Sequence, residues 1–297
     1  MSENYQPLVS VIVPVYNNSE LLRKCLTALE NQTYPQERYE VIVVDNASQE
    51  DIKSVVSDFK QAKLTFESKP GSYVARNQGI SIAKGEVIAF TDSDCIPAKD
   101  WIESGVKNLV KLENCGFISG RVEFIFQNPD SPTAIEFYDS FFLNQKKYIR
   151  EQFGATANIF TYASVFEKVG LFNPNLKSNG DRDWGNRVFA AGYNPSYCSE
   201  VCVQHPARNS WHQMYTKASR VMGGKFDRIK QEATFLTYTR EIATLIKPPV
   251  KFWIANIGNK KLKGKQKFML IIVTMFVHYS KALEVLRLQF GGTSKRN

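Results

Sequence analysis

The first 126 residues alternate between short apolar runs and segments whose apolar residues recur at helical spacing. The β-type runs occupy residues 9–16, 39–45, 64–67 and 86–91. The helical segments between them occupy residues 21–29, 52–59 and 72–83. Strands that alternate with helices form βαβ units, in which neighbouring strands are parallel. The pattern predicts an α/β fold with a mostly parallel central sheet flanked by helices.

Two later breaks divide the rest of the chain. A helix and another strand continue the pattern over residues 101–126, and the turn-forming cluster Asn128–Pro132 then ends it. The following stretch is aromatic and mixed, and from about Trp211 the chain becomes helical and basic, with an interruption at Lys247–Pro249. We therefore expect residues 1–126 and 127–210 to form two halves of one domain, followed by a C-terminal helical region, 211–297.

Polar residues follow three of the predicted strands. These are Tyr16–Asn18, Asp45–Ser48 and Thr91–Asp94. In open α/β sheets, ligands bind beyond the carboxyl ends of the strands, so these residues are the first candidates for a site. No Gly-x-Gly-x-x-Gly sequence and no Walker-type Gly-Lys-Ser/Thr loop occurs in the chain, which argues against the usual dehydrogenase and ATPase readings.

The segment Asp92-Ser93-Asp94 brings two carboxylates to the end of the strand at residues 86–91. Mg²⁺ and Mn²⁺ prefer oxygen ligands, and a diphosphate can complete their coordination. A divalent metal would then hold phosphates without a glycine-rich loop. An acidic turn without a metal is the alternative, because Asp is common in turns.

Four motifs occur in an order and spacing that resemble family 2 glycosyltransferases. They are residues 9–17 (VSVIVPVYN), 40–48 (EVIVVDNAS), 75–80 (ARNQGI) and 92–94 (DSD). The resemblance covers about residues 8–205. It implies the GT-A fold and inverting transfer of a sugar from a nucleotide diphosphate. The first half would bind the nucleotide sugar, and the second half would bind the acceptor.

The resemblance also implies roles for individual residues of the first half. Residues that would bind the nucleotide are Pro14, Tyr16, Asp45, Arg76 and Asp92. Asp94 would bind the metal, Mn²⁺ or Mg²⁺. Each role has a structural alternative: Asp45 suits an Asx turn or a helix cap, and Arg76 suits a surface helix. We interpret Asn17 and Asn18 as turn formers.

A second constellation, Asn179–Arg187, resembles the family's Glu-Asp-x-Asp-Leu-x-x-Arg motif. Asp181 then corresponds to the catalytic base, and Asp183, Trp184 and Arg187 are candidates for acceptor-side or secondary roles. Gly180 replaces the usual acid before that Asp, which leaves the choice between Asp181 and Asp183 open. An inverting transfer needs one carboxylate to take the proton of the acceptor hydroxyl. We favour Asp181, because Asp183 can instead cap the helix or pair with Arg187.

One of the three histidines, His205, lies in Val203–Arg208, where members of the family often carry a histidine that binds the metal or the diphosphate. Imidazole together with oxygen ligands suits Mn²⁺. The alternative is a buried or surface histidine with a structural role. We predict a metal site formed by Asp94 and His205.

The formal net charge of +9 is concentrated in the C-terminal region. Residues 247–297 contain eleven Lys or Arg and one acid, Glu284, so the rest of the chain is about neutral. This region also contains the apolar run Phe268–Val277, which at about ten residues is shorter than the roughly 20 of a spanning helix. We predict a helix that lies on an anionic membrane surface. A helical pair that packs on the body, or a solvated basic face, is the alternative.

These observations predict a metal-dependent, non-processive, hexosyltransferase-type enzyme. A UDP-sugar is the expected donor, a sugar or lipid-linked molecule the expected acceptor, and cell-surface polysaccharide or glycolipid assembly the expected setting. We do not expect nucleic acid to be a partner. Because residues 1–8 lack an apolar signal core, we expect a cytoplasmic protein, peripheral at the membrane. A nucleotidyltransferase and a non-catalytic protein that binds sugar nucleotides or membranes are the alternatives.

Overall fold

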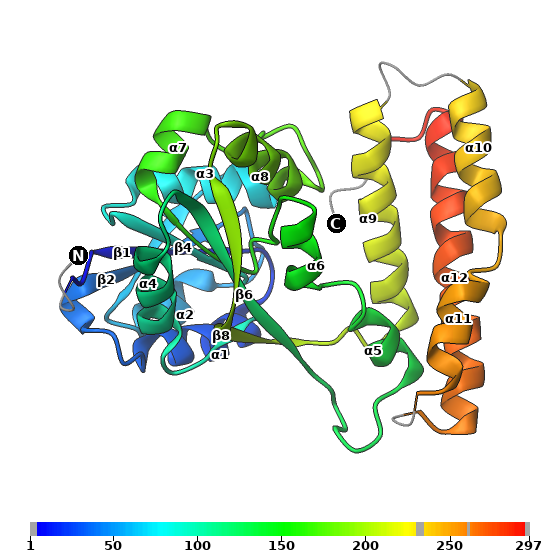
Figure 1. The fold of residues 1–297 in the computed structure, drawn as a ribbon, viewed down its shortest axis with the longest axis horizontal. Coiled ribbons are helices and arrows are strands. Elements are labelled where there is room, and N and C mark those ends of the chain that lie inside the picture. Colours follow the sequence, from blue (N-terminus) through cyan, green and yellow to red (C-terminus); the bar gives the residue numbers. More distant parts are fainter. Residues whose placement is uncertain (1–4, 230–234, 260–261, 295–297) are drawn as a thin grey trace. The chain divides into compact units, whose positions relative to one another are not determined.

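The computed structural model describes residues 5–229, 235–259 and 262–294 (Figure 1). The chain forms two compact units. The first unit comprises residues 1–124, 144–175 and 180–206, and the second comprises residues 125–143, 176–179 and 207–297.

The first unit is built on an eight-stranded sheet with the order β3-β2-β1-β4-β7-β6-β8-β5. Its strands are β1 (Val9–Val15), β2 (Tyr39–Asp45), β3 (Ala62–Phe66), β4 (Val87–Thr91), β5 (Ile96–Pro97), β6 (Cys115–Ile125), β7 (Asn158–Tyr162) and β8 (Asn194–Pro206). The pairs β2–β3, β1–β2 and β1–β4 are parallel, whereas β4–β7, β6–β7 and β5–β8 are antiparallel. The predicted α/β class is confirmed, and its parallel strands are those that the N-terminal periodicity indicated.

Helices flank this sheet. They are α1 (Ser19–Glu30), the 3-10 turn η1 (Gln36–Arg38), α2 (Ile52–Ser57), α3 (Ser72–Ile82), α4 (Trp101–Lys111), α6 (Gln145–Arg150), α7 (Ala163–Val169) and α8 (Gly180–Ala190). In the view of Figure 1, α3, α7 and α8 lie along the upper side of the sheet and α1 and α2 along the lower side. Helix α3 packs tightly on the sheet, because a Cβ at Gly79 would lie 2.6 Å from Cγ2 of Ile12 in β1. This close packing holds the N-terminal turns of α3 near the ends of β1 and β2.

The second unit is helical. Its helices are α5 (Ala134–Asp139), α9 (Trp211–Ile229), α10 (Phe235–Ile246), α11 (Val250–Ile257) and α12 (Gly264–Gln289). The buried face of α12 packs against α5 and α9 through Leu270, Val273 and Val277. The start of α9 at Trp211 and the interruption at Lys247–Pro249 are as predicted.

The apolar run Phe268–Val277 is much shorter than the helix α12 that contains it. The helix has 26 residues, so by length and composition it is able to cross a membrane, although the run itself has about ten. Its most apolar window has a mean hydropathy of 1.6, and 44% of that window is buried within the protein. The core helix of a soluble protein passes the same test, so helix length alone does not decide between a spanning and a packed helix.

Candidate active site

The polar ends of β1, β2 and β4 meet at one edge of the sheet, because these neighbouring strands are parallel. Two of the predicted residues lie on β1 or directly after it. Pro14 lies within the strand, opposite Val44 of β2. Tyr16 follows the strand, and 44% of its side chain is exposed. The exposed Tyr16 ring is therefore available to a ligand at this edge.

A network of turn hydrogen bonds joins the ends of β1 and β2. Asp45 Oδ1 accepts a bond from the backbone N–H of Ser48 (2.9 Å), and the Ser48 hydroxyl accepts one from the N–H of Asn17 (3.0 Å). Asn17 and Ala47 have positive φ angles of 47° and 62°, which is uncommon for residues other than glycine. The Asx-turn reading of Asp45 and the turn reading of Asn17 are confirmed. One oxygen of Asp45 serves the turn, and Oδ2 accepts no hydrogen bond from the described residues.

Arg76 and Asp92 form a partly buried ion pair between α3 and the end of β4. The Arg76 side chain is 4% exposed, so the surface-helix interpretation is wrong. One guanidinium nitrogen bonds Asp92 Oδ1, and another bonds the carbonyl of Ser72 at 3.3 Å. Among the described residues, none accepts a hydrogen bond from Nε of Arg76. The structure thus joins two residues that the sequence assigned separately to nucleotide binding.

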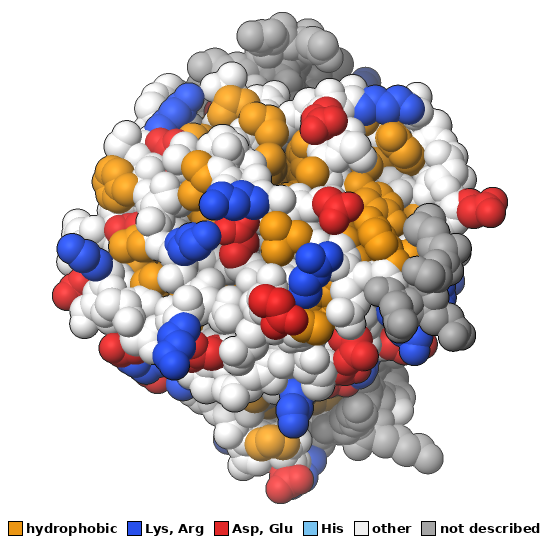
Figure 2. All heavy atoms as spheres, turned by 90° about the vertical axis from the view of Figure 1, so that its left-hand side faces the viewer, with side chains coloured by type: hydrophobic (Ala, Val, Ile, Leu, Met, Phe, Trp, Pro, Cys, Tyr) orange, Lys and Arg blue, Asp and Glu red, His pale blue; other side chains and the backbone are white. Residues whose placement is uncertain are grey.

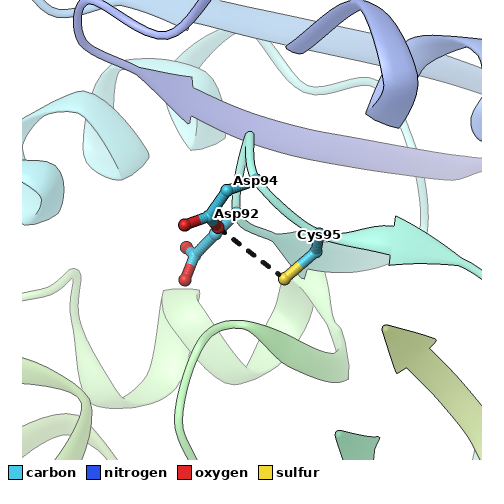
Figure 3. Close-up of side chains that lie close together, drawn as sticks. All are labelled: Asp92, Asp94 and Cys95. Carbon is cyan, nitrogen blue, oxygen red and sulfur yellow. Dashed lines mark hydrogen bonds between the residues drawn. The ribbon is translucent and has the colours of Figure 1, made fainter. Parts of the chain in front are cut away.

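The turn after β4 places Asp92, Asp94 and Cys95 together. One ligand atom of each lies within 4.8 Å of the others, and Figure 3 shows the two carboxylates side by side in this turn. The Cys95 sulfur lies 4.0 Å from Asp94 Oδ1. Burial raises the pKa of the Cys95 thiol, and the neighbouring carboxylates raise it further. Cys95 is therefore a neutral thiol, and the oxygens of Asp92 and Asp94 are the hard ligands at this position.

His205 lies beside Asp94, although 110 residues separate them in the sequence. The antiparallel pairing of β5 with β8 aligns Ile96 with Gln204 and so brings His205 to the turn after β4. His205 Nε2 lies 3.5 Å from Asp94 Oδ2, and the imidazole is 5% exposed against the ring of Phe124. Carboxylate oxygens with an imidazole nitrogen are a donor set that fits Mn²⁺. The residues predicted for the metal therefore lie together.

Asp181 lies in the first turn of α8 and is enclosed by residues of α3 and α6. Its Oδ1 accepts a hydrogen bond from the N–H of Arg182 (2.9 Å), and the Tyr73 hydroxyl of α3 lies 3.4 Å from the same oxygen. Burial raises the pKa of the Asp181 carboxyl, and the Arg182 N–H and the Arg76 guanidinium partly oppose this effect. A raised pKa makes the ionised carboxylate a stronger base.

Asp183 and Arg187 have a structural role in α8. Asp183 Oδ2 pairs with Nε of Arg187 at 3.2 Å, one helical turn away. The same guanidinium binds the carbonyls of Val169, Gly170 and Leu171 at the end of α7. Asp183 is therefore committed to an ion pair that joins α8 to the preceding loop, as the alternative reading expected.

Trp184 lies in the core rather than on a ligand-accessible surface. Its side chain is 0% exposed and packs against the rings of Phe117, Phe166 and Phe172. Of the acceptor-side and secondary roles expected for Trp184, its burial favours a secondary, structural one. The residue instead fixes the orientation of α8, which carries Asp181.

Sequence reasoning missed Tyr73 and Cys95 as neighbours of the candidate residues. Tyr73 is three positions before Arg76, so helical spacing places both on one face of α3. One feature of the sequence could have indicated Tyr73: the family's acidic residue is replaced by Gly180. The Tyr73 ring packs where a side chain at residue 180 would lie. Cys95 directly follows the Asp-Ser-Asp motif, but its burial was not predictable from spacing.

Comparisons with known proteins identify the family of the chain. The family model described as "Glycosyl transferase family 2" matches residues 10–170. Glycosyltransferase AglE of Haloferax volcanii is 39% identical over 256 residues, which cover 82% of this chain and 83% of that protein.

Two solved structures share the fold. A mannosyltransferase from Pyrobaculum calidifontis, in complex with GDP-Man and Mn²⁺, matches with a TM-score of 0.63 and 19% identity over 95% of this chain and 88% of that one. S. aureus TarS 1-349 in complex with UDP-GlcNAc matches with a TM-score of 0.55 and 15% identity over 97% and 93% of the two chains. The fold is that of GT-A glycosyltransferases. On the sequence matches, the chain belongs to glycosyl transferase family 2 and is a glycosyltransferase.

Proposed function

We propose that this protein is a metal-dependent, inverting and non-processive hexosyltransferase that transfers a sugar from a nucleotide diphosphate to an acceptor hydroxyl. The observation that carries the proposal is the presence of three groups of polar residues on different elements of one compact unit. Arg76 pairs with Asp92, Asp94 lies beside His205, and Asp181 lies on α8 next to Tyr73 of α3. The first two groups suit the donor, and the third suits the acceptor.

The metal would be held by Asp94 and His205, with Asp92 nearby. The donor set fits this role because it offers hard oxygens and one imidazole, and because Cys95 is a buried neutral thiol. A divalent metal there would supply positive charge to the diphosphate, which is the leaving group when its bond to the sugar breaks. The solved mannosyltransferase from Pyrobaculum calidifontis contains Mn²⁺, which supports Mn²⁺ or Mg²⁺ as the ion.

In the nucleotide-binding part, Tyr16 and Asp45 would contact the base and ribose. Arg76 would contact the base or the phosphates, and its pairing with Asp92 fixes the orientation of both side chains. Relatives of the same fold bind GDP-Man and UDP-GlcNAc, so we propose a nucleotide-diphosphate hexose, with UDP the expected nucleotide. In this scheme residues 1–126 form the donor half and residues 127–210 the acceptor half.

Asp181 would act as the general base. Its carboxylate would remove the proton of the acceptor hydroxyl while the hydroxyl oxygen attacks the anomeric carbon from the face opposite the diphosphate. The bond to the diphosphate breaks as the new glycosidic bond forms, so the configuration inverts. The raised pKa of Asp181 supports this role, since a stronger base accepts the proton more readily.

The experiment that tests the proposal uses GDP-mannose and UDP-GlcNAc as donors, with MnCl₂ and a panel of lipid-linked and free sugars as acceptors. Proton NMR of the first product formed reads the anomeric configuration directly. We expect a product of inverted configuration and one added sugar for each acceptor. Retention of configuration would contradict the role of Asp181, and processive chain growth would contradict the non-processive assignment.

We also propose that the helical unit contacts an anionic membrane. Exposed apolar side chains lie along one face of α12 at separations of three, four and seven residues. We call this face the α12 stripe, and its residues are Phe268, Ile272, Tyr279, Leu283, Leu286 and Phe290. Exposed lysines lie before the helix and at its start, including Lys251, Lys263 and Lys265. Apolar side chains next to bases suit the interface of an anionic bilayer.

A membrane contact would give the enzyme access to lipid-linked acceptors, in polysaccharide or glycolipid assembly, from the cytoplasmic side. Basic and acidic side chains are interspersed on the face drawn in Figure 2. The first 246 residues are also about neutral, so the C-terminal bases are the main source of attraction to anionic lipid.

The triple variant Phe268→Ser, Leu283→Ser, Phe290→Ser is expected to reduce binding to vesicles of phosphatidylserine and phosphatidylcholine by at least about tenfold. The three side chains are 62–87% exposed, so their removal leaves the packing of the helical unit intact while it removes the apolar contact with lipid. Cosedimentation at low salt measures the binding. Deletion from Lys247 is a less clean test, because it would uncover the buried contacts of α5 and α9 with α12.

The matched control is Phe66→Ser, Ile82→Ser, Leu171→Ser, which removes three exposed apolar side chains from the sheet unit. We expect this control to bind vesicles like the unchanged protein. Equal sedimentation of all three proteins would show that the α12 stripe is not a membrane contact. Binding that persists on pure phosphatidylcholine at high salt would show that anionic lipid is not its partner.

A further inference from the structure

Tyr73 connects the helix that carries Arg76 to the helix that carries Asp181. Its side chain is 7% exposed and contacts the ring of Phe172 at a centroid distance of 5.8 Å. The Tyr73 hydroxyl lies 3.4 Å from Asp181 Oδ1. A Cβ at residue 180 would lie 2.7 Å from Cε2 of Tyr73, closer than real Cβ contacts allow. Any side chain at residue 180 would therefore collide with the ring.

Gly180 is also the position at which this chain departs from the acidic residue that its family's motif places before the base. We propose that Tyr73 is the residue that positions the Asp181 carboxylate, and that its ring occupies the space that a side chain at residue 180 would fill. The proposal rests on the role of Asp181 as the base. In this arrangement a neutral hydroxyl replaces a second carboxylate next to the base.

The phenol is suited to donate a hydrogen bond to Asp181. Burial raises the pKa of the Tyr73 hydroxyl, which favours the protonated form that can donate. The distance of 3.4 Å is longer than the roughly 2.7–2.8 Å usual for a hydroxyl donor. Such catalytic bonds commonly shorten when substrate binds.

A neutral hydroxyl and a second carboxylate affect the pKa of Asp181 in opposite directions. Two neighbouring carboxylates repel each other and raise each other's pKa, whereas a donated hydrogen bond stabilises the ionised form. The other groups that face Asp181 are Arg76 of α3, Tyr148 of α6 and the backbone N–H of Arg182. Tyr73 adds a side-chain hydrogen bond from its hydroxyl to the carboxylate.

The first test is the variant Tyr73→Phe, which keeps the ring and removes only the hydroxyl. Carbon-13 NMR of the carboxyl groups in the substrate-free protein measures the pKa of Asp181, with the signal assigned by its absence in Asp181→Asn. We expect the Asp181 pKa to rise by about half a unit to one unit, because the carboxylate loses a donor. The control Tyr39→Phe removes another buried hydroxyl, which bonds the Leu29 carbonyl, and should leave the Asp181 pKa unchanged.

Steady-state kinetics with the donor that the enzyme uses should show the same shift. Since Tyr73→Phe raises the Asp181 pKa, the acid limb of the kcat profile should move to higher pH by the same amount. Turnover above this limb should fall by about tenfold, because the carboxylate loses the hydrogen bond that orients it, and KM for the donor should not change. An unchanged Asp181 pKa in Tyr73→Phe would overturn the proposal. If the pKa shifts but Asp181→Asn keeps full turnover, the positioning contact stands and the assignment of the base fails.

The second test addresses the space at residue 180 and does not depend on activity. Gly180→Ala should lower the melting temperature of the unchanged protein by several degrees, because the new methyl group meets the Tyr73 ring. In a Tyr73→Ala background the same substitution should have little effect. An equal loss in both backgrounds would show that the Tyr73 ring does not exclude a side chain at this position.

Discussion

Replacing Asp181 by asparagine should lower the turnover of sugar transfer by about 10² to 10⁴-fold, the range usual for a lost general base. Asparagine keeps the size of the side chain and one acceptor oxygen, but it cannot take the proton of the acceptor hydroxyl. The carboxylate that pairs with Arg76 is that of Asp92, so we expect the loss of the Asp181 carboxylate to change donor affinity little. Calorimetry of donor binding and initial rates of transfer measure the two effects independently.

The pH dependence of the unchanged enzyme should agree with this role. Burial raises the pKa of Asp181 in the folded protein, so the carboxylate becomes protonated at a higher pH than an exposed aspartate does. The rate should therefore fall as pH is lowered through this raised pKa, above the ordinary range of about 3.9. In Asp181→Asn this acid limb should be absent.

The matched control for Asp181 is Asp183→Asn, two residues further along α8. Asp183 is paired with Arg187, so its loss should weaken the attachment of α8 to the loop after α7 and reduce stability modestly, by about 0.3–0.5 kcal/mol for an exposed pair of this kind. Asp183→Asn could instead reduce turnover more than Asp181→Asn, with folding and donor affinity unchanged. Asp183 would then be the base, and the alignment of residues 179–187 with the family's motif would be wrong.

Asp94→Ala should abolish most of the metal-dependent affinity for the nucleotide-diphosphate donor, a loss of at least about 10²-fold. Asp94 provides carboxylate oxygens beside Nε2 of His205, and the chain has no glycine-rich loop that would hold a diphosphate without a metal. Calorimetric titration with GDP-mannose and UDP-GlcNAc, in MnCl₂ and in excess chelator, measures the loss. The affinity of Asp94→Ala in MnCl₂ should equal that of the unchanged protein in chelator.

Asp100→Ala is the control for this measurement. Asp100 is an exposed acid that follows the same turn, and its Oδ2 accepts a hydrogen bond from the Ser104 hydroxyl in α4. Its removal should leave donor affinity and metal dependence unchanged. Unchanged donor affinity in excess chelator would count against the metal site as a whole, whereas chelator sensitivity that persists in Asp94→Ala would place the metal on other residues.

The position of the proposed donor site was largely predictable, because parallel strands place their carboxyl ends at one edge of the sheet. The polar ends of β1, β2 and β4 therefore had to meet once the alternation of strands and helices was recognised. The Asx turn at Asp45 was predictable for a similar reason, since the hydrogen bond to Ser48 is local in sequence. Motif order then indicated the family, which the sequence matches confirm.

Spacing did not determine which face of a helix is buried when the helix has apolar residues on several sides. Trp184 is adjacent to Asp183 in the sequence, yet it lies in the aromatic core and Asp183 does not. In the same way, a run of about ten apolar residues did not predict the length of α12, which has 26 residues. The helix has one buried face and one exposed apolar stripe. Such choices depend on which elements pack against the helix.

The sequence by itself determined the α/β class, the family, and the sheet edge at which the polar strand ends meet, because these depend on local periodicity and motif order. Only the tertiary structure decided the contacts between distant segments. The register of β5 with β8 brings His205 to Asp94, and the packing of α3 against α8 brings Tyr73 to Asp181. Antiparallel register and helix packing depend on how well side chains about a hundred residues apart in the sequence fit together. No local pattern in the sequence predicts that fit.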